Sequence, residues 1–347
     1  MKLLYLLFAG LASAALRHVG VDWSSLLIEE RAGISYQDPS GTTLPLEKIL
    51  VASGVDTVRQ RIWVNPADGN YNLEYNLQLA RRANAAGLKV YLDFHYSDNW
   101  ADPGKQHAPA GWPQEIGALE RKLYEYTLSV CNAFAQAGIV PAIISIGNEI
   151  RTGMLWPVGS TDGNKFGNVA RLLRVASRGV RESSLGNRPK IMVHIDNGWD
   201  WGLQEWWYES VLAAGGFELG DFDQMGVSYY PFYNSGATLA SLRTSLQNMA
   251  RRWGKEVVVA EVNWPVQCSR PAYAFPADLR DIPFSWQGQA DFLRKVASAT
   301  EGAGGAGIFY WEPAWVDNAG LGSSCERNTM FEWPGKGLPS LNVFKEL

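Results

Sequence analysis

Two glutamates at the ends of apolar segments are the side chains of this sequence best suited to acid–base or nucleophilic chemistry. Glu149 ends the segment 142–149 and Glu261 ends the segment 256–261, and both segments have the β-branched, apolar composition of buried strands. A carboxylate in such a place is costly to desolvate, so it usually has an ionic partner or a chemical role. Either glutamate alone would fit an ordinary salt bridge at a strand end. Two of them in a tryptophan-rich chain favour the paired carboxylates of a retaining glycosidase.

Two arginines and two tyrosines are candidate partners of the Glu261 carboxylate. Arg59 and Arg61 are two residues apart in a predicted strand, so both side chains point to the same face of the sheet. If this face is the interior of a barrel, either guanidinium could keep Glu261 ionised and lower its pKa. Tyr229 or Tyr230, at the end of another predicted strand, could donate a hydrogen bond to the same carboxylate. The residues alone leave open which member of each pair faces Glu261.

Further polar and aromatic residues near the ends of predicted strands are expected to line or support the same site. Asn148, next to Glu149, could hydrogen-bond the 2-hydroxyl of a sugar, and Trp311 could form the floor beneath the central sugar ring. The other candidates for substrate binding or support are Asp93, His95, Trp100, His194, Asp196 and Trp264. Many tryptophans lie in predicted loops, where indole rings offer flat apolar surfaces to sugars: Trp100, Trp112, Trp199, Trp201, Trp264, Trp315 and Trp333.

The sequence lacks the patterns of the main alternative catalytic sites. None of its four histidines belongs to an H-E-x-x-H pattern, and no G-x-S-x-G segment marks a serine nucleophile. His18 and His107 have the contexts of surface or loop residues. We therefore expect neither a metal ion nor a cofactor, and we expect Glu149 and Glu261 to carry the chemistry.

Short strand-like segments alternate along the chain with amphipathic helical segments, which is typical of βα units around a parallel sheet. Eight strands are predicted, over residues 18–21, 56–63, 88–94, 142–149, 190–195, 224–228, 256–261 and 307–310. Helices are predicted over residues 72–86, 118–137, 166–184 and 237–252. This alternation predicts a single (β/α)8 TIM barrel, in which the carboxyl ends of the strands converge on one mouth. A doubly wound sheet would require a G-x-G-x-x-G turn after the first strand, which residues 20–23 do not provide.

The amino-terminal residues predict a secreted protein. Residues 1–14 combine Lys2, an apolar segment over 3–11 and a small-residue cleavage site at 12–14, as secretory signal peptides do. The apolar segment is too short to span a bilayer, and no later segment approaches about 20 apolar residues. With a net charge of −4, the chain has no electrostatic reason to bind nucleic acid or an anionic membrane. We expect residues 15–347 to form one monomeric catalytic domain outside the cell.

Secretion permits a disulfide, and three cysteines leave one thiol unpaired. Cys131 lies within a helical pattern and is expected to be a buried free thiol. Cys268 and Cys325 both lie in long loops rich in glycine and proline. Their pairing is therefore favoured among the three pairings that the sequence allows.

Five motifs are similar, in this order along the chain, to those of glycoside hydrolase family 53, which includes fungal endo-β-1,4-galactanases. They are VRQRIWVNP at 58–66, HYSDNWADP at 95–103, SIGNEI at 145–150, SYYP at 228–231 and EVNWP at 261–265. The resemblance implies a retaining barrel of clan A, with Glu149 as the acid/base, Glu261 as the nucleophile and Arg59 as the arginine of the second strand. It also implies that Cys268 and Cys325 occupy the loop regions where bacterial members bind calcium, as in fungal members, so no calcium is expected.

The resemblance further implies a substrate and a partner. It points to galactan or arabinogalactan polysaccharide, hydrolysed at internal β-1,4-galactosidic bonds of pectic galactan and type I arabinogalactan. Two alternatives stay open at this point. Another clan-A barrel could act on mannan or cellulose, and a catalytically inactive barrel could only bind carbohydrate. Loss of either glutamate would indicate the inactive case, and both are present.

Overall fold

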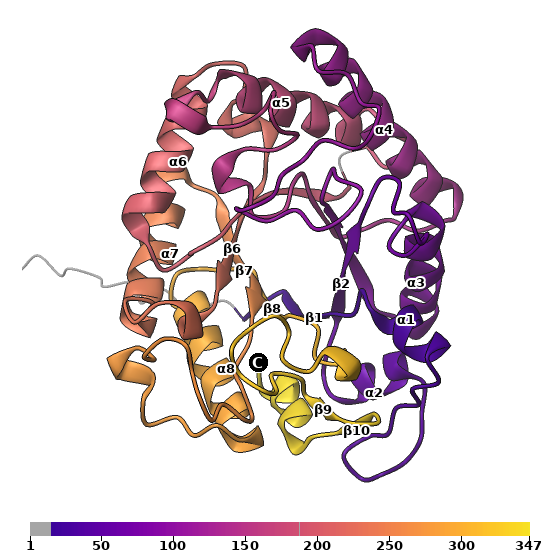
Figure 1. The fold of residues 1–347 in the computed structure, drawn as a ribbon, viewed down its shortest axis with the longest axis vertical. Helices are drawn as coiled ribbons and strands as arrows, with labels where there is room; N and C mark the ends of the chain where they lie inside the picture. The colour runs from indigo at the N-terminus through magenta and orange to yellow at the C-terminus, as the bar shows by residue number, and fades with distance from the viewer. Residues whose placement is uncertain (1–14, 187) are drawn as a thin grey trace, which may run out of the picture.

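The computed structural model describes residues 15–186 and 188–347, and the predicted signal peptide, residues 1–14, lies outside this range. Eight strands form a closed barrel in the order β1 to β8, and all neighbouring strands are parallel (Figure 1). Helices surround the barrel, so the described chain is a single (β/α)8 TIM barrel, as the sequence predicted. Within these residues, no helix is both long enough and apolar enough to cross a membrane.

The barrel strands agree with the predicted ones in number and order. They are β1 His18–Asp22, β2 Thr57–Ile62, β3 Lys89–Phe94, β4 Ile143–Ser145, β5 Lys190–Ile195, β6 Gln224–Tyr229, β7 Glu256–Val262 and β8 Gly307–Tyr310. The largest difference is that β4 ends at Ser145 rather than at residue 149. Gly147 and Glu149 have positive φ angles of 129° and 48°, which end the extended conformation. The prediction that Glu149 ends a strand is therefore wrong, because the residue lies in the loop beyond β4.

The four predicted helices are present, with ends displaced by up to three residues. They are α3 Leu73–Ala86, α4 Ile116–Gln136, α5 Gly167–Arg181 and α7 Leu239–Trp253. The side chain of Asn72 and the left-handed Gly87 cap the two ends of α3. Four further helices were not predicted: α1 Leu26–Arg31, α2 Leu46–Ala52, α6 Trp201–Ala213 and α8 Trp286–Glu301. Trp201 therefore begins a helix rather than lying in a loop.

Shorter elements complete the fold. The 3₁₀ helices are η1 Ile150–Thr152, η2 Asp162–Asn164, η3 Leu219–Asp221, η4 Pro231–Tyr233, η5 Ala277–Leu279, η6 Val316–Asn318 and η7 Pro339–Glu346. The strands β9 Phe331–Glu332 and β10 Lys336–Gly337 form a separate antiparallel pair. Several of these short elements lie in the loops that follow barrel strands, where the site is expected.

Two apolar layers stabilise the barrel. The larger layer joins the strands to the surrounding helices, and the smaller one fills the barrel interior with Tyr91, Ile143, Met192, Val258, Ala260, Ala306 and Phe309. Gly20 of β1 permits this interior packing, because a Cβ atom at that position would lie 2.3 Å from the ring of Phe309. The packed interior closes the barrel below its mouth, so a substrate must approach from the carboxyl ends of the strands.

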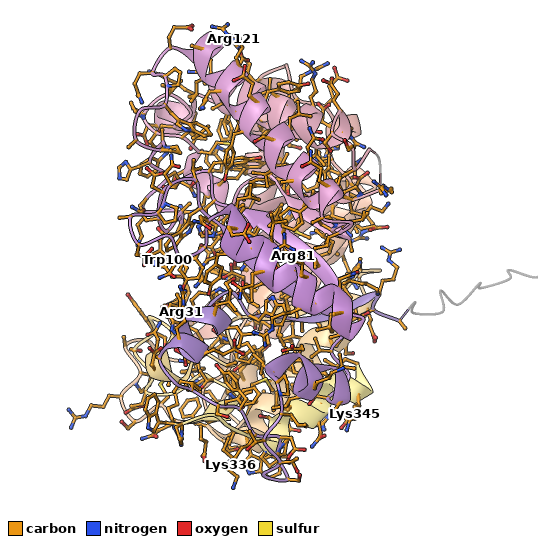
Figure 2. All side chains as sticks on the ribbon, turned by 90° about the vertical axis from the view of Figure 1, so that its right-hand side faces the viewer. Arg31, Arg81, Trp100, Arg121, Lys336 and Lys345 are labelled. Atoms are coloured by element: carbon orange, nitrogen blue, oxygen red, sulfur yellow. A yellow bond between two sulfur atoms is a disulfide. The ribbon has the colours of Figure 1, made fainter. Side chains whose placement is uncertain are left out.

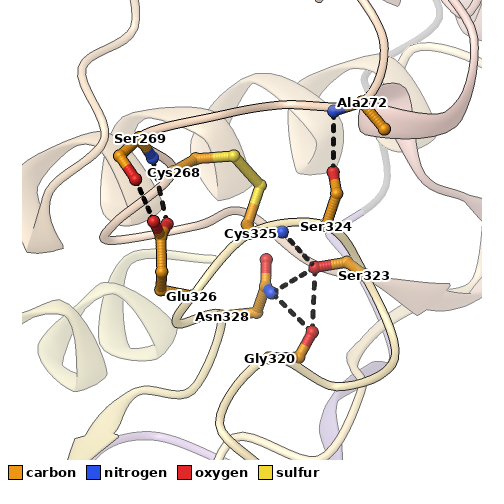
Figure 3. Close-up of a disulfide and its surroundings, with 9 residues drawn as sticks. All are labelled: Cys268, Ser269, Ala272, Gly320, Ser323, Ser324, Cys325, Glu326 and Asn328. Carbon is orange, nitrogen blue, oxygen red and sulfur yellow. Dashed lines mark hydrogen bonds between the residues drawn. A yellow bond between two sulfur atoms is a disulfide. The ribbon is translucent and has the colours of Figure 1, made fainter.

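A disulfide joins the loop after β7 to the segment after β8 (Figure 3). Cys268 and Cys325 have Cα atoms 4.3 Å apart and are separated by 57 residues in the sequence. Next to the bridge, the backbone amide of Ser269 donates to the carboxylate of Glu326 at 3.0 Å. Cys131 is a buried free thiol within α4. Both cysteine predictions are therefore confirmed.

Replacing both bridge cysteines by serine is expected to lower the melting temperature by several degrees. In the loop-entropy account, a bridge that closes a loop of this length stabilises the folded state by about 4 kcal/mol. Calorimetry of Cys268→Ser/Cys325→Ser beside the wild type measures the effect. Peptide mapping of the unreduced wild type should find Cys131 alkylated. An unchanged melting temperature would mean that other contacts already fix these loops.

Candidate active site

The mouth of the barrel contains a cleft of about 370 Å³ that both predicted glutamates line. Its other walls carry polar and aromatic side chains from the strands and from the loops that follow them, including Arg59, Arg61, His95, Trp100, Asn148, Asp196, Tyr230, Tyr233 and Trp311. In the side view of Figure 2, Trp100 lies on the left of the molecule, away from Lys345 near the C-terminus. A concave site of this kind, with two carboxyl groups and several indole rings, has the composition of a sugar-cleaving site.

Glu261 makes two strong contacts near the end of β7. Arg59 Nη2 lies 2.7 Å from one carboxylate oxygen, and the hydroxyl of Tyr230 donates to the other oxygen at 2.6 Å. Of the two candidates in each pair, Arg59 and Tyr230 are therefore the ones that contact Glu261. Tyr229 instead donates to the carbonyl oxygen of Ala237 in the core. The register between β6 and β7 shifts at this point, as at a β-bulge, which changes the direction of the neighbouring side chains.

Arg59 connects four strands of the barrel through one buried guanidinium. Its side chain is 1% exposed and forms ion pairs with Asp22 at 2.6 Å and Asp93 at 2.8 Å, in addition to Glu261. It also donates to the side-chain oxygen of Asn148 at 2.8 Å. A buried guanidinium requires such partners, because an unpaired charge in the interior is strongly destabilising. Asp93 therefore supports Arg59 from below rather than lining the cleft.

Arg61 lies beneath the aromatic wall of the cleft. Its guanidinium carbon is 4.3 Å from the ring centre of Trp100 and 4.2 Å from that of Tyr71. Its Nη1 forms an ion pair with Glu312 at 2.6 Å. Trp100 also stacks on Trp315, with ring centres 6.2 Å apart and planes 19° from parallel. These contacts give the Trp100 indole a fixed orientation.

Asp22 and Glu312 were not among the predicted site residues. Asp22 ends β1, and Glu312 follows β8 by two residues. The rule that selected Glu149 and Glu261, a carboxylate close to the end of a buried strand, therefore also selects these two. Burial raises the pKa of Glu312 to about 7, and the Arg61 guanidinium opposes this shift.

Glu149 differs from Glu261 in its surroundings. In the described part of the chain, no basic side chain forms an ion pair with it, and its backbone has a left-handed φ of 48°. The side-chain amide of Gln106 donates to the carbonyl oxygens of Asn148 and Glu149, at 2.8 Å and 3.3 Å, and so fixes this segment. Burial raises the pKa of Glu149 well above its usual value, and the charges of Glu261 and Asp196 raise it further.

Glu149 and Glu261 therefore differ in which of them carries the negative charge of the pair. Burial raises the pKa of Glu261 as well, while the Arg59 guanidinium and the Tyr230 hydroxyl oppose that shift. Arg59 thus lowers this pKa, as expected of an arginine beside Glu261, but burial outweighs it and the net shift is upward. Since Glu261 is the group beside the cation, it keeps the negative charge of the pair and Glu149 keeps the proton. Such a pair can supply a nucleophile and a general acid at the same pH.

His95 and His194 are neutral residues that support the site. Nδ1 of His95 accepts two N–H hydrogen bonds, at 3.1 Å and 3.2 Å, so Nε2 carries the hydrogen and donates to Asp93 at 3.2 Å. Burial lowers the pKa of both imidazoles, to about 3 for His194. His194 is fully buried and contacts the hydroxyl of Ser228 at 2.9 Å. Of the two, only His95 lines the cleft.

The predicted loop tryptophans have different environments: some line the cleft, others are buried in the core, and Trp333 is 65% exposed outside the cleft. Trp100 and Trp311 line the cleft, and their ring centres are 6.1 Å apart. Trp264 is fully buried, and its indole N–H donates to the carbonyl oxygen of Pro283 at 3.0 Å. It offers no face to a sugar, so of the two roles expected for Trp264, substrate binding or support, its position fits only support. The ring supports the loop after β7 instead. Trp112 is also buried.

Asp196 lines the cleft on the same side as Glu149. The Nε of Arg151 donates to its two carboxylate oxygens, at 2.9 Å and 3.1 Å, and the side chain of Asn197 donates to it at 2.7 Å. Asp196 is therefore a fixed acceptor at the edge of the cleft. Over residues 15–186 and 188–347, no group of three or more His, Cys, Asp or Glu side chains could hold a metal ion.

Comparisons with known sequences agree with this geometry. The sequence model of Glycosyl hydrolase family 53 matches residues 18–344. An arabinogalactan endo-beta-1,4-galactanase of Thermothelomyces thermophilus is 58% identical over 334 residues, which cover 96% of this chain and 100% of the relative. The arabinogalactan endo-beta-1,4-galactanase A of Emericella nidulans is 55% identical over 348 residues, which cover 100% of this chain and 99% of the relative.

The solved structures lead to the same family. A fungal beta-1,4-galactanase is 58% identical and has a TM-score of 0.93, covering 96% of this chain and 100% of that one. The resemblance in the five motifs is thereby confirmed. This chain belongs to glycosyl hydrolase family 53 and is a glycoside hydrolase.

Proposed function

We propose that this protein is an endo-β-1,4-galactanase that cleaves internal bonds of pectic galactan and type I arabinogalactan with retention of anomeric configuration. The observation that carries the proposal is one cleft in which Glu261 is paired with Arg59 and Glu149 carries a raised pKa. The names of the relatives, arabinogalactan endo-beta-1,4-galactanases, support this substrate.

The proposed reaction has two steps that use both carboxyl groups. In the first, a Glu261 oxygen attacks the anomeric carbon while Glu149 gives its proton to the glycosidic oxygen, and the bond to the leaving chain breaks. In the second, ionised Glu149 removes a proton from water, which attacks the same carbon and releases Glu261 from the ester. Forming the ester neutralises Glu261 and so lowers the pKa of Glu149 between the steps, as its change from acid to base requires.

Neighbouring residues are proposed to contact the sugar at the reacting centre. The side-chain oxygen of Asn148 accepts from Arg59, and its amide donates one hydrogen to the carbonyl oxygen of Ala101 at 2.8 Å. Its second amide hydrogen is left for the 2-hydroxyl of the substrate. The indole rings of Trp100 and Trp311 supply apolar surfaces for sugar faces.

The alternatives that the sequence left open have less support. The relatives' names favour galactan over mannan and cellulose, and an inactive binding protein would not need two carboxyl groups with opposed surroundings. We further propose that the chain acts outside the cell, because its disulfide suits an oxidising compartment, and that it acts there as a monomer.

Purified protein assayed side by side on β-1,4-galactan, mannan and cellulose should release reducing ends from galactan at by far the highest rate. Retention predicts that the first product is the β-anomer, which NMR detects before mutarotation. Initial release of the α-anomer would contradict the two-step reaction. Faster hydrolysis of mannan or cellulose would contradict the proposed substrate.

The two glutamates should lose activity in different ways when each is replaced by glutamine. Glu261→Gln should abolish turnover on every substrate, because no other group forms the ester. Glu149→Gln should lose most activity on galactan but far less on an activated aryl galactoside, whose leaving group departs without a proton. Added azide should partly restore the second step in Glu149→Gln by replacing the activated water.

Melting temperatures of both variants distinguish catalytic from structural effects. If the glutamates only stabilised the barrel, both variants would melt lower and lose activity uniformly on all substrates. Equal loss on both substrates in Glu149→Gln, with no response to azide, would show that the acid/base assignment is wrong.

Replacing Tyr230 by phenylalanine should move the acidic limb of the pH–activity profile to higher pH. The Tyr230 hydroxyl lowers the pKa of Glu261 by donating to its carboxylate, so removing the hydroxyl raises that pKa. Activity requires ionised Glu261, so acid inactivates the variant at a pH roughly 0.5 to 1 unit higher. Profiles of kcat/KM on galactan measure the shift. Tyr229→Phe is the matched control, because its hydroxyl donates into the core, and an equal shift there would contradict the prediction.

A further inference from the structure

A second hollow, of about 960 Å³, lies outside the catalytic cleft. It is formed by the segment before α4, the segment before α5 and the first residues of both helices. These two helices lie side by side at the top of Figure 1. The proposed reaction does not use this hollow. Its size is in the range of sites that bind small molecules or short stretches of a polymer.

Trp156 is held rigidly in the wall of this hollow. Its indole N–H donates to the carbonyl oxygen of Thr152 at 2.8 Å, and its backbone amide donates to the carbonyl oxygen of Gln106 at 2.7 Å. The imidazole of His107 packs edge-on against the indole, with ring centres 5.6 Å apart and planes at 88°. The half-buried ring therefore has its polar group satisfied and its orientation set before any ligand arrives.

The two segments that form the hollow also form one wall of the catalytic cleft. The Thr152 hydroxyl donates to the carbonyl oxygen of Pro103, which lines the cleft. Gln106 accepts from Trp156 on one side and donates to the segment that carries Glu149 on the other. From Pro103 to the hollow at His107 the chain spans at most about 14 Å. A polysaccharide that leaves the cleft on this side can therefore reach the hollow along the protein surface.

The chemistry of the hollow suits an uncharged sugar. Gln114, Asp162 and Lys165 are exposed around Trp156 and offer amide, carboxylate and ammonium groups to hydroxyls. The charges of Asp162 and Lys165 cancel, so the rim does not favour an anion or a cation. A galactosyl ring has an apolar C–H face that can pack on an indole while its hydroxyls meet polar groups at the edge.

We propose that this hollow, with Trp156 as its anchor, is a second galactosyl-binding site for the same galactan chain that occupies the cleft. It lies on the Glu149 side, where the glycosidic oxygen receives its proton, so it binds the leaving part of the chain. The inference rests on the proposed function, because it takes galactan as the substrate. Its consequence is a preference for long chains that the catalytic centre alone does not provide.

The test compares Trp156→Ala with the wild type on polymeric β-1,4-galactan and on an activated aryl β-galactobioside, which is too short to reach the hollow. On the polymer, kcat/KM should fall about fivefold, mainly through KM, as expected for one lost aromatic contact. On the short substrate, kcat/KM should stay within about twofold of the wild type. Trp333→Ala is the matched control, because Trp333 is 65% exposed in the turn between β9 and β10, and it should change neither value.

Two rim variants keep the test decisive if Trp156→Ala does not fold. Gln114→Ala and Lys165→Ala alter exposed side chains and should lower kcat/KM on the polymer alone, by a smaller factor. Unchanged polymer kinetics in Trp156→Ala, or in both rim variants, would overturn the proposal. Equal losses on both substrates would also overturn it, because Trp156 would then only brace the cleft wall. A wild-type protein without activity on galactan would instead overturn the proposed function.

Discussion

The proposed catalytic arrangement depends on one buried cation, the guanidinium of Arg59. Moving such a charge out of water costs several kcal/mol, and the cost is offset only when carboxylates surround it with good geometry. Asp22 and Asp93 provide two of these carboxylates, and Glu261 provides the third. The charge of Glu261 is therefore part of the barrel's own electrostatic balance. Its protonation would leave Arg59 with fewer charged partners, so the ion pairs of Arg59 favour the ionised form of this carboxylate, as its proposed role as nucleophile requires.

A second arginine on the same strand, Arg61, supports the aromatic wall of the cleft. Arg61 is two residues from Arg59, and its ion pair is with Glu312 rather than Glu261. Its guanidinium lies between aromatic rings and fixes Trp100 at the cleft wall. Strand β2 thus supports both the reacting carboxylate and the surface that a sugar would meet. The two arginines are two residues apart, which is the repeat that places side chains on the same face of a β-strand.

The sequence was sufficient for the architecture and for bringing Glu149 and Glu261 to one cleft, because both follow from local patterns. Alternation of strands and helices predicts the barrel. Carboxylates near apolar strand ends include Glu149 and Glu261, although the same rule also selects Asp22 and Glu312. The choices that the sequence left open, between the two tyrosines and between binding and support for each tryptophan, depend on three-dimensional register. Tyr229 and Tyr230 are adjacent, and the register shift between β6 and β7 cannot be read from composition. Trp264 follows a strand just as Trp311 does, but the later loop that covers it is distant in the sequence.

The two proposed catalytic carboxyl groups sit on backbones of unequal stability. Glu261 belongs to a strand that is hydrogen-bonded on both sides. Glu149 is a loop residue with a left-handed backbone conformation, and the side-chain amide of Gln106 hydrogen-bonds the carbonyl oxygens of this segment. Loops of this kind open locally at lower free energy than central strands. With the proposed roles, we expect heating to disturb the position of the proton-transferring carboxyl group before that of the attacking one. Thermal inactivation would then begin with a loss of acid–base function while the barrel is still folded.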